Sequence, residues 1–280
     1  MRVLIAGAGY VGTQLGLRLV RRGATVYALR RDPSGLPAPL HGLRADLTNY
    51  DTLDRLPRNL TAVAYTAGAD ESSDHAYERA YVAGVRHLLA ALDAQQIAPR
   101  RIVFTSSTAV YAQQDGEWVD ESSLADATHF TGARVLEAEG LLRTSGRSTV
   151  ALRLGGIYGP GRARLIDTVR RGEATYVPGP PRYVNRNHRD DCAAALEHLL
   201  DLPDPAHVYI GADGNPADQR AVVEWLAAQL GAPPPRPATA LNHARRGGSN
   251  KRCRSDRLQG SGFRFAYPSF REGYSELIER

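Results

Sequence analysis

The sequence predicts a doubly wound α/β fold, in which helices cover both faces of a parallel sheet. Short apolar runs alternate with helical patterns, the first run ends in a glycine-rich turn, and that turn opens a helix. At 280 residues the chain is long enough to bury a substantial core. We therefore expect one large sheet domain with a smaller lobe attached.

The expected strands and helices alternate along most of the chain. The strand-like runs are RVLIAG from Arg2, TVYAL from Thr25, HGLRAD from His41, TAVAYTA from Thr61, RIVFTS from Arg101, TVALRL from Thr149 and HVYIGA from His207. Helical patterns cover residues 10–22, 74–94, 132–142, 190–200 and 217–230, with a short turn at 51–56 and a helix that ends near 171.

The regular alternation of strand-like and helical patterns ends after Leu154, where proline and glycine cluster in GGIYGPGRARL and PGPPRYVNRNH. We expect residues 1–155 together with 184–212 to form the sheet domain. Residues 156–183 and 213–280 are then expected to form a smaller C-terminal α/β lobe that binds substrate.

Composition argues against several classes of protein. The net charge is +5, but the arginines come as scattered pairs without a dense stripe, so no nucleic-acid partner is expected. No apolar stretch reaches the roughly 18 residues of a membrane span. Cys192 and Cys253 give neither a disulfide framework nor a metal-ligand spacing, which indicates a cytoplasmic protein without a bound metal.

The first glycine-rich turn has the spacing of a dinucleotide-binding site. Gly7, Gly9 and Gly12 form G-x-G-x-x-G between a strand and a helix. The first glycine permits the tight turn, the second lets a pyrophosphate approach the backbone, and the third lets helix and strand pack closely. Backbone N–H groups at the helix start, including those of Tyr10 and Val11, would face the phosphates. Glycines used only for turning are the alternative.

The end of the second strand bears on the choice of cofactor. An acidic residue there usually binds the ribose of NAD, but this chain has Arg30 and Arg31. Guanidinium groups pair well with a 2′-phosphate, so the sequence favours NADP. NAD remains the alternative, with Asp32 as a displaced ribose ligand and the arginines as a solvated pair.

Other cofactor candidates follow the carboxyl ends of later strands, where ligands of such sheets bind. Asp46 is placed to meet the adenine edge, although turn chemistry would explain it equally well. The candidates at the ends of the third, fourth and fifth strands are Asp46, Leu47, Thr66, Ala67, Gly68, Thr105 and Ser106.

Several stretches together resemble the extended short-chain dehydrogenase/reductase superfamily, in its NAD-dependent epimerase/dehydratase group. They are GAGYVGTQLGLRL, AYTAGA, YVAGVRHLLAAL, RIVFTSSTAVYA, LRLGGIYGPGR and HRDDCAAAL, from Arg2 to about Leu200. The resemblance implies a Rossmann fold with a nicotinamide dinucleotide. It also implies a homodimer through the helices at 74–94 and 132–142.

The resemblance also implies a catalytic serine. In such proteins a serine or threonine four residues before the tyrosine of a V-Y-(G/A) turn polarises the substrate oxygen, and Ser107 stands four residues before Tyr111. Tyr111 is itself a candidate proton donor, although such a tyrosine more often packs over the turn.

The Y-x-x-x-K pair that usually completes this site is missing. In the helix HFTGARVLEAEGLL its positions fall on Thr131 and Val135, or on Phe130 and Arg134 in the other register. Lys251 is the chain's only lysine, and no tyrosine stands four residues before it. The chain is therefore similar to atypical members, whose fold and dinucleotide site carry over while the usual mechanism does not.

Other charged residues have both a functional and a structural interpretation. Arg134 would hold the ribose or an oxyanion, or lie on a solvated helix face. His188 would form an acid/base pair with a neighbouring aspartate, although Asp190 and Asp191 fit helix capping better. Cations that would hold a substrate diphosphate, or else form scattered surface charge, are Arg162, Arg182, Arg186, Lys251 and Arg252.

The sequence thus predicts an NADP-preferring oxidoreductase or epimerase with a non-standard catalytic site. Its substrate would be a small hydroxy or carbonyl compound, or one similar to a nucleotide sugar. The alternative is a catalytically inactive NADP-binding sensor or scaffold protein.

Overall fold

The structure is a computed structural model that describes residues 1–238 and 250–279. The chain divides into two compact units. The first unit comprises residues 1–111, 124–154 and 192–209, and the second comprises the described residues of 112–123, 155–191 and 210–280.

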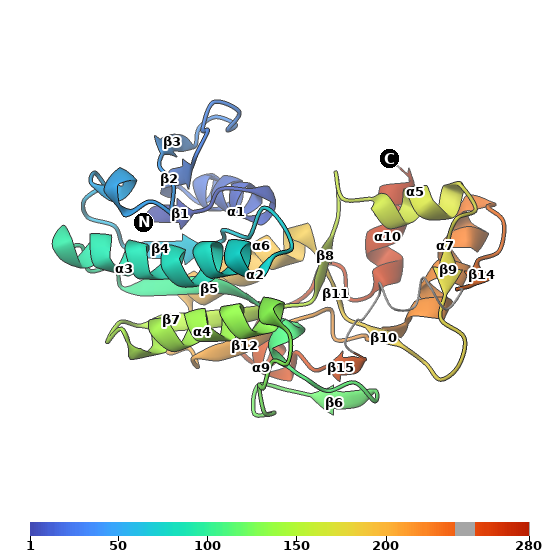
Figure 1. The fold of residues 1–280 in the computed structure, drawn as a ribbon. Coiled ribbons are helices and arrows are strands. Elements are labelled where there is room, and N and C mark those ends of the chain that lie inside the picture. The colour runs from blue at the N-terminus through green and yellow to red at the C-terminus, as the bar shows by residue number, and fades with distance from the viewer. Residues whose placement is uncertain (239–249, 280) are drawn as a thin grey trace. The chain divides into compact units, whose positions relative to one another are not determined.

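A seven-stranded sheet forms the centre of the first unit, with strand order β12-β7-β5-β4-β1-β2-β3 (Figure 1). All neighbouring pairs from β7 to β3 are parallel. The crossover from β3 on one edge to β4 beside β1 makes the sheet doubly wound, as predicted. The strands are β1 (Arg2–Ala6), β2 (Thr25–Arg30), β3 (His41–Arg44), β4 (Ala62–Tyr65), β5 (Arg101–Ser107), β7 (Thr149–Leu154) and β12 (Val208–Gly211).

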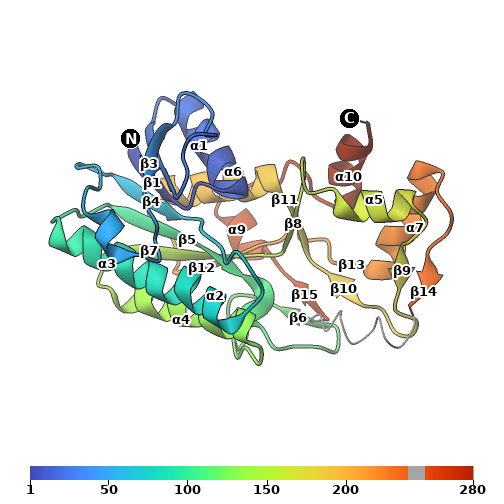
Figure 2. The same ribbon diagram turned by 45° about the horizontal axis from the view of Figure 1, so that its top comes forward.

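Helices cover both faces of this sheet. Figures 1 and 2 show α1 and α6 on one face, and α2, α3 and α4 on the other. Every residue of β4 and β7 is buried, as expected for strands that are covered on both faces. The helices are α1 (Tyr10–Arg21), α2 (Asp74–Tyr77), α3 (Gly84–Ala94), α4 (Phe130–Thr144) and α6 (Arg189–Asp201), with short 3₁₀ turns η1 (Tyr50–Leu53) and η3 (Thr108–Val110).

The helix predicted at 74–94 is not continuous. A π-helical turn, η2 (Glu78–Ala83), separates α2 from α3. The Tyr65 hydroxyl donates a hydrogen bond to the carbonyl oxygen of Ala80, and a Cβ at Gly84 would overlap that hydroxyl. The inserted phenol therefore accounts for the widened turn, because its hydroxyl satisfies a carbonyl within the widened part of the helix.

The second unit contains short two-stranded sheets and small helices. The paired strands are β6 (Glu117–Val119) with β15 (Lys251–Cys253), β8 (Gly156–Tyr158) with β11 (Arg186–His188), β9 (Thr175–Tyr176) with β14 (Arg236–Pro237), and β10 (Tyr183–Val184) with β13 (Ala217–Asp218). The helices are α5 (Arg164–Arg170), α7 (Gln219–Leu230), α9 (Asp256–Gly260) and α10 (Phe270–Glu279).

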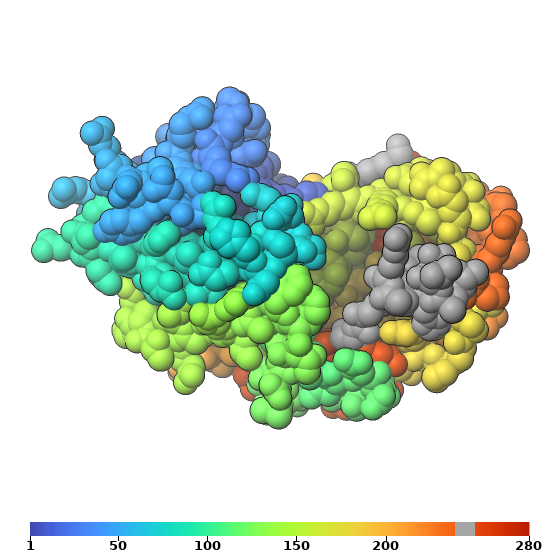
Figure 3. Space-filling view, viewed as in Figure 1, coloured from blue at the N-terminus to red at the C-terminus, as the bar shows by residue number. Residues whose placement is uncertain are grey.

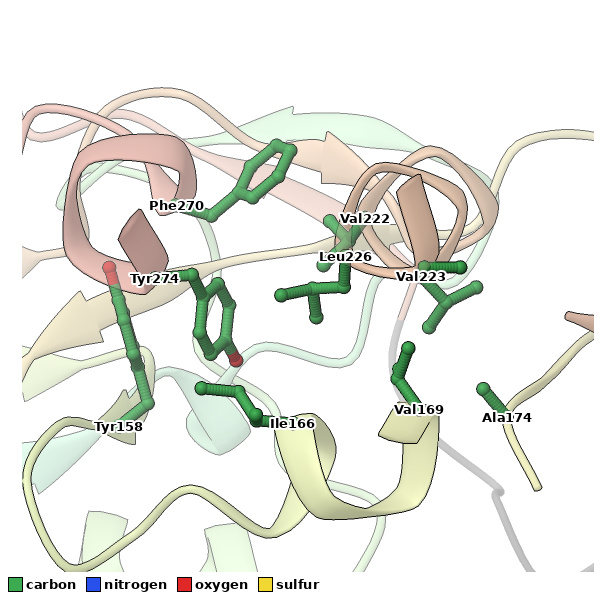
Figure 4. Close-up of a cluster of buried hydrophobic side chains, with 10 residues drawn as sticks. Tyr158, Ile166, Val169, Ala174, Val222, Val223, Leu226, Phe270 and Tyr274 are labelled. Atoms are coloured by element: carbon green, nitrogen blue, oxygen red, sulfur yellow. The ribbon is translucent and has the colours of Figure 1, made fainter. Parts of the chain in front are cut away.

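An apolar cluster between α5, α7 and α10 holds this unit together. Figure 4 shows Ile166 and Val169 of α5 opposite Leu226 of α7, with Tyr274 of α10 beside them. Tyr158 packs on Tyr274 with ring centroids 4.5 Å apart. This unit therefore has a core of its own.

The boundaries between the units differ from the expected ones. Residues 112–123 belong to the second unit, because β6 pairs with β15 far along the chain. Residues 184–191 also belong there, since β10 and β11 pair with β13 and β8. Propensity along the chain does not reveal these long-range pairings.

Asp213 in the second unit predicts a pH dependence of stability. Its side chain is buried, and burial raises its pKa from 3.8 to about 7. Between these values the folded protein holds a proton that the unfolded chain releases. The free energy of unfolding should therefore fall as pH rises towards 7, by up to about 1.4 kcal/mol per pH unit from this group, and level off above.

Urea unfolding at several pH values between 5 and 8 measures this contribution. Asp213→Asn should show a flatter profile over that range, because the amide carries no titratable proton. An unchanged slope in the variant would show that Asp213 does not titrate in this way.

Candidate functional site

The three glycines of the first turn have different surroundings. Gly7 adopts a φ of +95°, and a Cβ there would collide with Ala67. A Cβ on Gly12 would overlap Thr66 Oγ1 and lie 2.8 Å from the Gly7 carbonyl oxygen. A Cβ on Gly9, at the N-terminus of α1, would meet only the Gly7 carbonyl oxygen, at 3.9 Å. The first and third glycines therefore serve packing, whereas the second leaves open space beside the helix N-terminus.

A cavity of about 620 Å³ lies beside this turn, where β1, β2, β3 and β4 end. Figure 3 shows this face of the first unit, with residues 30–48 in blue and the segment near residue 75 in cyan. The predicted cofactor residues that line the cavity are Gly7, Gly9, Arg30, Arg31, Asp46, Leu47, Thr66, Ala67 and Gly68. Tyr10, Val11, Gly12, Thr105, Ser106 and Arg134 are not in its lining.

The sequence did not reveal the residues that line the other side of the cavity. They lie after β4 and around α2 and η2, namely Asp70, Glu71, His75, Ala76, Arg79 and Ala80. The rule that ligands bind at the carboxyl ends of strands should have extended to Asp70 and Glu71, since both follow β4 closely. The residues near η2 have no local signal, because only the fold brings them to this edge.

Asp46 is fixed by its neighbours. Its Oδ1 accepts hydrogen bonds from the backbone N–H and the hydroxyl of Thr48, both at 2.9 Å. The Thr48 hydroxyl in turn accepts a 2.8 Å hydrogen bond from Arg79 Nη2. This chain of bonds connects the end of β3 to η2 across the cavity lining.

The two arginines that follow one another at the end of β2 differ in their partners. Arg31 forms a two-pronged ion pair with Asp70, with N···O distances of 2.8 and 2.9 Å. Arg30 donates a long 3.4 Å hydrogen bond to the Ala8 carbonyl oxygen. Among the described residues no carboxylate lies within 4 Å of Arg30's charged nitrogens, so this guanidinium is available to an anionic ligand.

Asp32 also lines the cavity and has its own local role. Its Oδ1 accepts a 3.2 Å hydrogen bond from the Ser34 backbone N–H, which lowers the pKa of this carboxyl group. Arg44 pairs with it at 3.4 Å. Asp32 therefore has the bonds of a turn-forming residue.

These residues fit a nicotinamide dinucleotide. The open position at Gly9 and the start of α1 suit a pyrophosphate. The cavity at the ends of β1 to β4 suits the adenosine half, and Arg30 faces no competing acid within ion-pair distance among the described residues. A guanidinium such as that of Arg30 is a suitable partner for an anionic group of the nucleotide.

Ser107 ends β5 next to a buried polar network. Its Oγ accepts a 3.1 Å hydrogen bond from the Ala109 backbone N–H, so the hydroxyl keeps its hydrogen for donation. The preceding Ser106 donates a 2.5 Å hydrogen bond to Glu139 Oε1. The strand end that carries Ser107 is therefore tied to α4.

Arg153 on β7 completes this network. It forms two hydrogen bonds with the Glu139 carboxylate, at 2.9 and 2.6 Å. Its Nη1 donates a third, at 2.8 Å, to the hydroxyl of Tyr111. Tyr111 is only 2% exposed, so its hydroxyl points into the unit and not to the surface. Its role as a proton donor stays a prediction.

The helix that should carry the catalytic pair offers structural contacts in both registers. Val135 is buried, whereas Phe130 packs edge-on against Tyr77 with centroids 5.4 Å apart. Arg134 donates hydrogen bonds of 2.7 and 3.0 Å to Asp74 and another of 3.0 Å to Glu137. The structure thus places Arg134 in an ion-pair cluster between α4 and α2.

His188 lies in the second unit, buried between the rings of Tyr158 and Tyr267. Its Nδ1 accepts a 3.3 Å hydrogen bond from the Asp190 backbone N–H. The Asp191 carboxylate accepts bonds from the backbone N–H groups of Ala266 and Tyr267, at 2.8 and 2.9 Å. Asp191 therefore anchors the C-terminal segment.

The predicted diphosphate cations also lie in the second unit, in different surroundings. Arg186 donates a 2.8 Å hydrogen bond to the Tyr274 hydroxyl. Arg252 lies over the rings of Trp118 and Tyr183, 4.8 Å from each centroid. Lys251 is fully buried, and burial lowers its pKa. Arg162 and Arg182 are less buried, and binding of a diphosphate by any of the five cations stays a prediction.

Comparison with known proteins places this chain in a family. The model of the NAD dependent epimerase/dehydratase family matches residues 3–211. A solved structure from Methylobacillus flagellatus, described as an NAD-dependent epimerase/dehydratase, is 34% identical, with a TM-score of 0.81 over 99% of this chain and 97% of that chain. No described helix is both long and apolar enough to cross a membrane.

Two further relatives cover almost the whole chain. MoeE5, solved in complex with UDP-glucose and NAD, is 27% identical, with a TM-score of 0.84 over 100% of this chain and 98% of its own. The 3-diazoavenalumate denitrifying reductase of a Streptomyces species is 28% identical over 98% of this chain and 99% of its own length. With the glycine turn, the doubly wound sheet and the family match taken together, the chain belongs to the NAD-dependent epimerase/dehydratase family.

Proposed function

We propose that this protein is an NADP-preferring oxidoreductase or epimerase that acts on a small hydroxy or carbonyl compound, or on a substrate similar to a nucleotide sugar. The observation that carries the cofactor preference is Arg30 at the end of β2, which lines the cavity and has no carboxylate of the described residues within ion-pair distance. The turn at Gly9 and the N-terminus of α1 hold the pyrophosphate, and Arg30 binds the 2′-phosphate.

Ser107 orients the substrate in this proposal. When bound, the nicotinamide ring supplies or accepts a hydride. The Ser107 hydroxyl donates a hydrogen bond to the substrate oxygen, because the Ala109 N–H occupies only one of its acceptor positions. The Ser106–Glu139–Arg153 network holds the end of β5, so it fixes where Ser107 lies.

The named relatives support the substrate class. MoeE5 was solved with a nucleotide sugar, and the Streptomyces relative is a reductase. A homodimer through the helical segments at 74–94 and 132–142 is a further proposal, which size-exclusion chromatography tests. A cytoplasmic location is another, which cell fractionation tests.

Turnover tests this function. We expect NADPH oxidation with a panel of carbonyl compounds, or epimerisation of UDP-sugars, and a kcat about 100-fold lower in Ser107→Ala. The dissociation constant of NADPH should stay within about twofold of wild type, because Ser107 is not in the cavity lining. Equal turnover by wild type and variant would remove Ser107 from the mechanism.

Two glycine variants separate binding from folding. Gly9→Ala should weaken dinucleotide binding at least about tenfold while leaving the free energy of unfolding nearly unchanged, because its Cβ enters open space. Gly12→Ala should instead cost about 1–3 kcal/mol of stability, because its Cβ overlaps Thr66. Nucleotide titration and urea unfolding measure both. Equal behaviour of the two variants would contradict the assignment of Gly9 to the pyrophosphate.

A sensor or scaffold protein without turnover is the second candidate. The observation that favours it is the Tyr111 hydroxyl, which Arg153 holds in a buried site. In that case NADPH should bind tightly while no substrate of the panel is converted.

A further inference from the structure

The Arg31–Asp70 ion pair joins two sides of the cavity in the first unit. Arg31 directly follows β2, and Asp70 lies in the segment after β4, and both line the cavity. Nη1 lies 2.8 Å from one carboxylate oxygen and Nη2 lies 2.9 Å from the other. The end-on edge of this guanidinium, formed by Nη1 and Nη2, is therefore occupied by a carboxylate of the protein itself.

Its neighbour Arg30 provides the contrast. The side chains are adjacent in sequence and line the same cavity, but Arg30 donates its hydrogen bond to a backbone carbonyl oxygen, at 3.4 Å. Asp46 and Glu71 add further negative charge to the lining of the same cavity. An anion that approaches the end of β2 thus meets one available guanidinium and one that is already neutralised.

We propose that Asp70 is a specificity-determining residue that competes with the adenosine 2′-phosphate for Arg31. This inference rests on the proposed preference for NADP. A phosphate that takes the end-on edge of Arg31 must displace Asp70. A phosphate that takes the side edge, through Nε and Nη2, lies beside the carboxylate and is repelled by it.

The competition is weak enough to be overcome by a cofactor. The Arg31 and Asp70 side chains are 63% and 68% exposed, and exposed ion pairs contribute little to stability. Asp70 therefore lowers the affinity for the phosphorylated dinucleotide without abolishing it. A dinucleotide without the 2′-phosphate leaves the ion pair in place, so its affinity does not depend on Asp70.

Asp70→Asn in the full chain tests this role, with 2′,5′-ADP, NADPH and NADH as titrated probes. We expect the variant to bind 2′,5′-ADP and NADPH about threefold to tenfold more tightly than wild type at low salt. NADH and 5′-ADP should change by less than about twofold. Raising the ionic strength should reduce the gain.

Glu71→Gln is the matched control. It removes the same charge one residue farther along, from a side chain that lines the same cavity and accepts a 2.9 Å hydrogen bond from Ser73 rather than pairing with Arg31. An equal gain in Glu71→Gln would overturn the proposal, because the effect would then come from overall charge. In the Arg31→Gln background, Asp70→Asn should lose most of its effect.

The outcomes also separate this inference from the proposed function. If wild type prefers NADPH and Asp70→Asn binds it no better, the competition is wrong while the NADP preference stands. If wild type prefers NADH or binds neither dinucleotide, both proposals fail.

Discussion

Replacing Arg30 by aspartate is expected to weaken NADPH binding by about 100-fold. The variant loses a charge-assisted hydrogen bond to the 2′-phosphate, worth about 1.5–3 kcal/mol, and adds a repelling carboxylate. NADH carries no phosphate at this position, so its affinity should stay within about threefold, or rise because a carboxylate can bind the ribose hydroxyls. Fluorescence titration of both nucleotides measures the two effects.

Arg44→Asp is the control for this variant. Arg44 ends β3, is 71% exposed and pairs with Asp32, but it does not line the cavity. It makes the same change of charge without the proposed contact, and we expect NADPH affinity to change less than about threefold. If both variants lose affinity equally, long-range electrostatics and not a phosphate contact explains the loss.

Arg153→Met is expected to cause the largest loss of stability, about 3–5 kcal/mol. It leaves the Glu139 carboxylate without its cation. Because the Glu139 side chain is only 9% exposed, water cannot replace the lost partner. The substitution also removes the donor to the Tyr111 hydroxyl. Urea unfolding measures the loss. Wild type and variant can be compared if both unfold in one cooperative transition.

The double variant Arg153→Met, Glu139→Gln checks the cause. The neutral amide costs less to bury than an unpaired carboxylate, so the second change should recover part of the lost stability. A double variant less stable than Arg153→Met would mean that packing around Arg153, and not the unpaired charge, causes the loss.

The sequence predicted the sheet, and several of its candidate residues line the cavity, because both depend on local patterns. Gly7, Gly9 and Gly12 lie within six residues, and the buried strands β4 and β7 are continuous apolar runs. The departure from the usual acidic residue at the end of β2, where this chain has Arg30, is likewise visible in a few adjacent residues.

Long-range contacts were out of reach for the same reasoning. Arg31 and Asp70 are 39 residues apart, and Ser106 and Glu139 are 33 apart, so no spacing rule connects them. The assignment of residues 112–123 to the second unit depends on strand β15, more than 130 residues later in the chain. Such features follow from the topology of the chain and need the structure to be seen.

We propose that the first unit holds a dinucleotide site that prefers NADP. The most direct test is to measure the dissociation constants of NADPH and NADH for the wild-type protein side by side at one ionic strength. We expect NADPH to bind at least about tenfold more tightly, through the 2′-phosphate and Arg30. Equal affinities, or a preference for NADH, would contradict it.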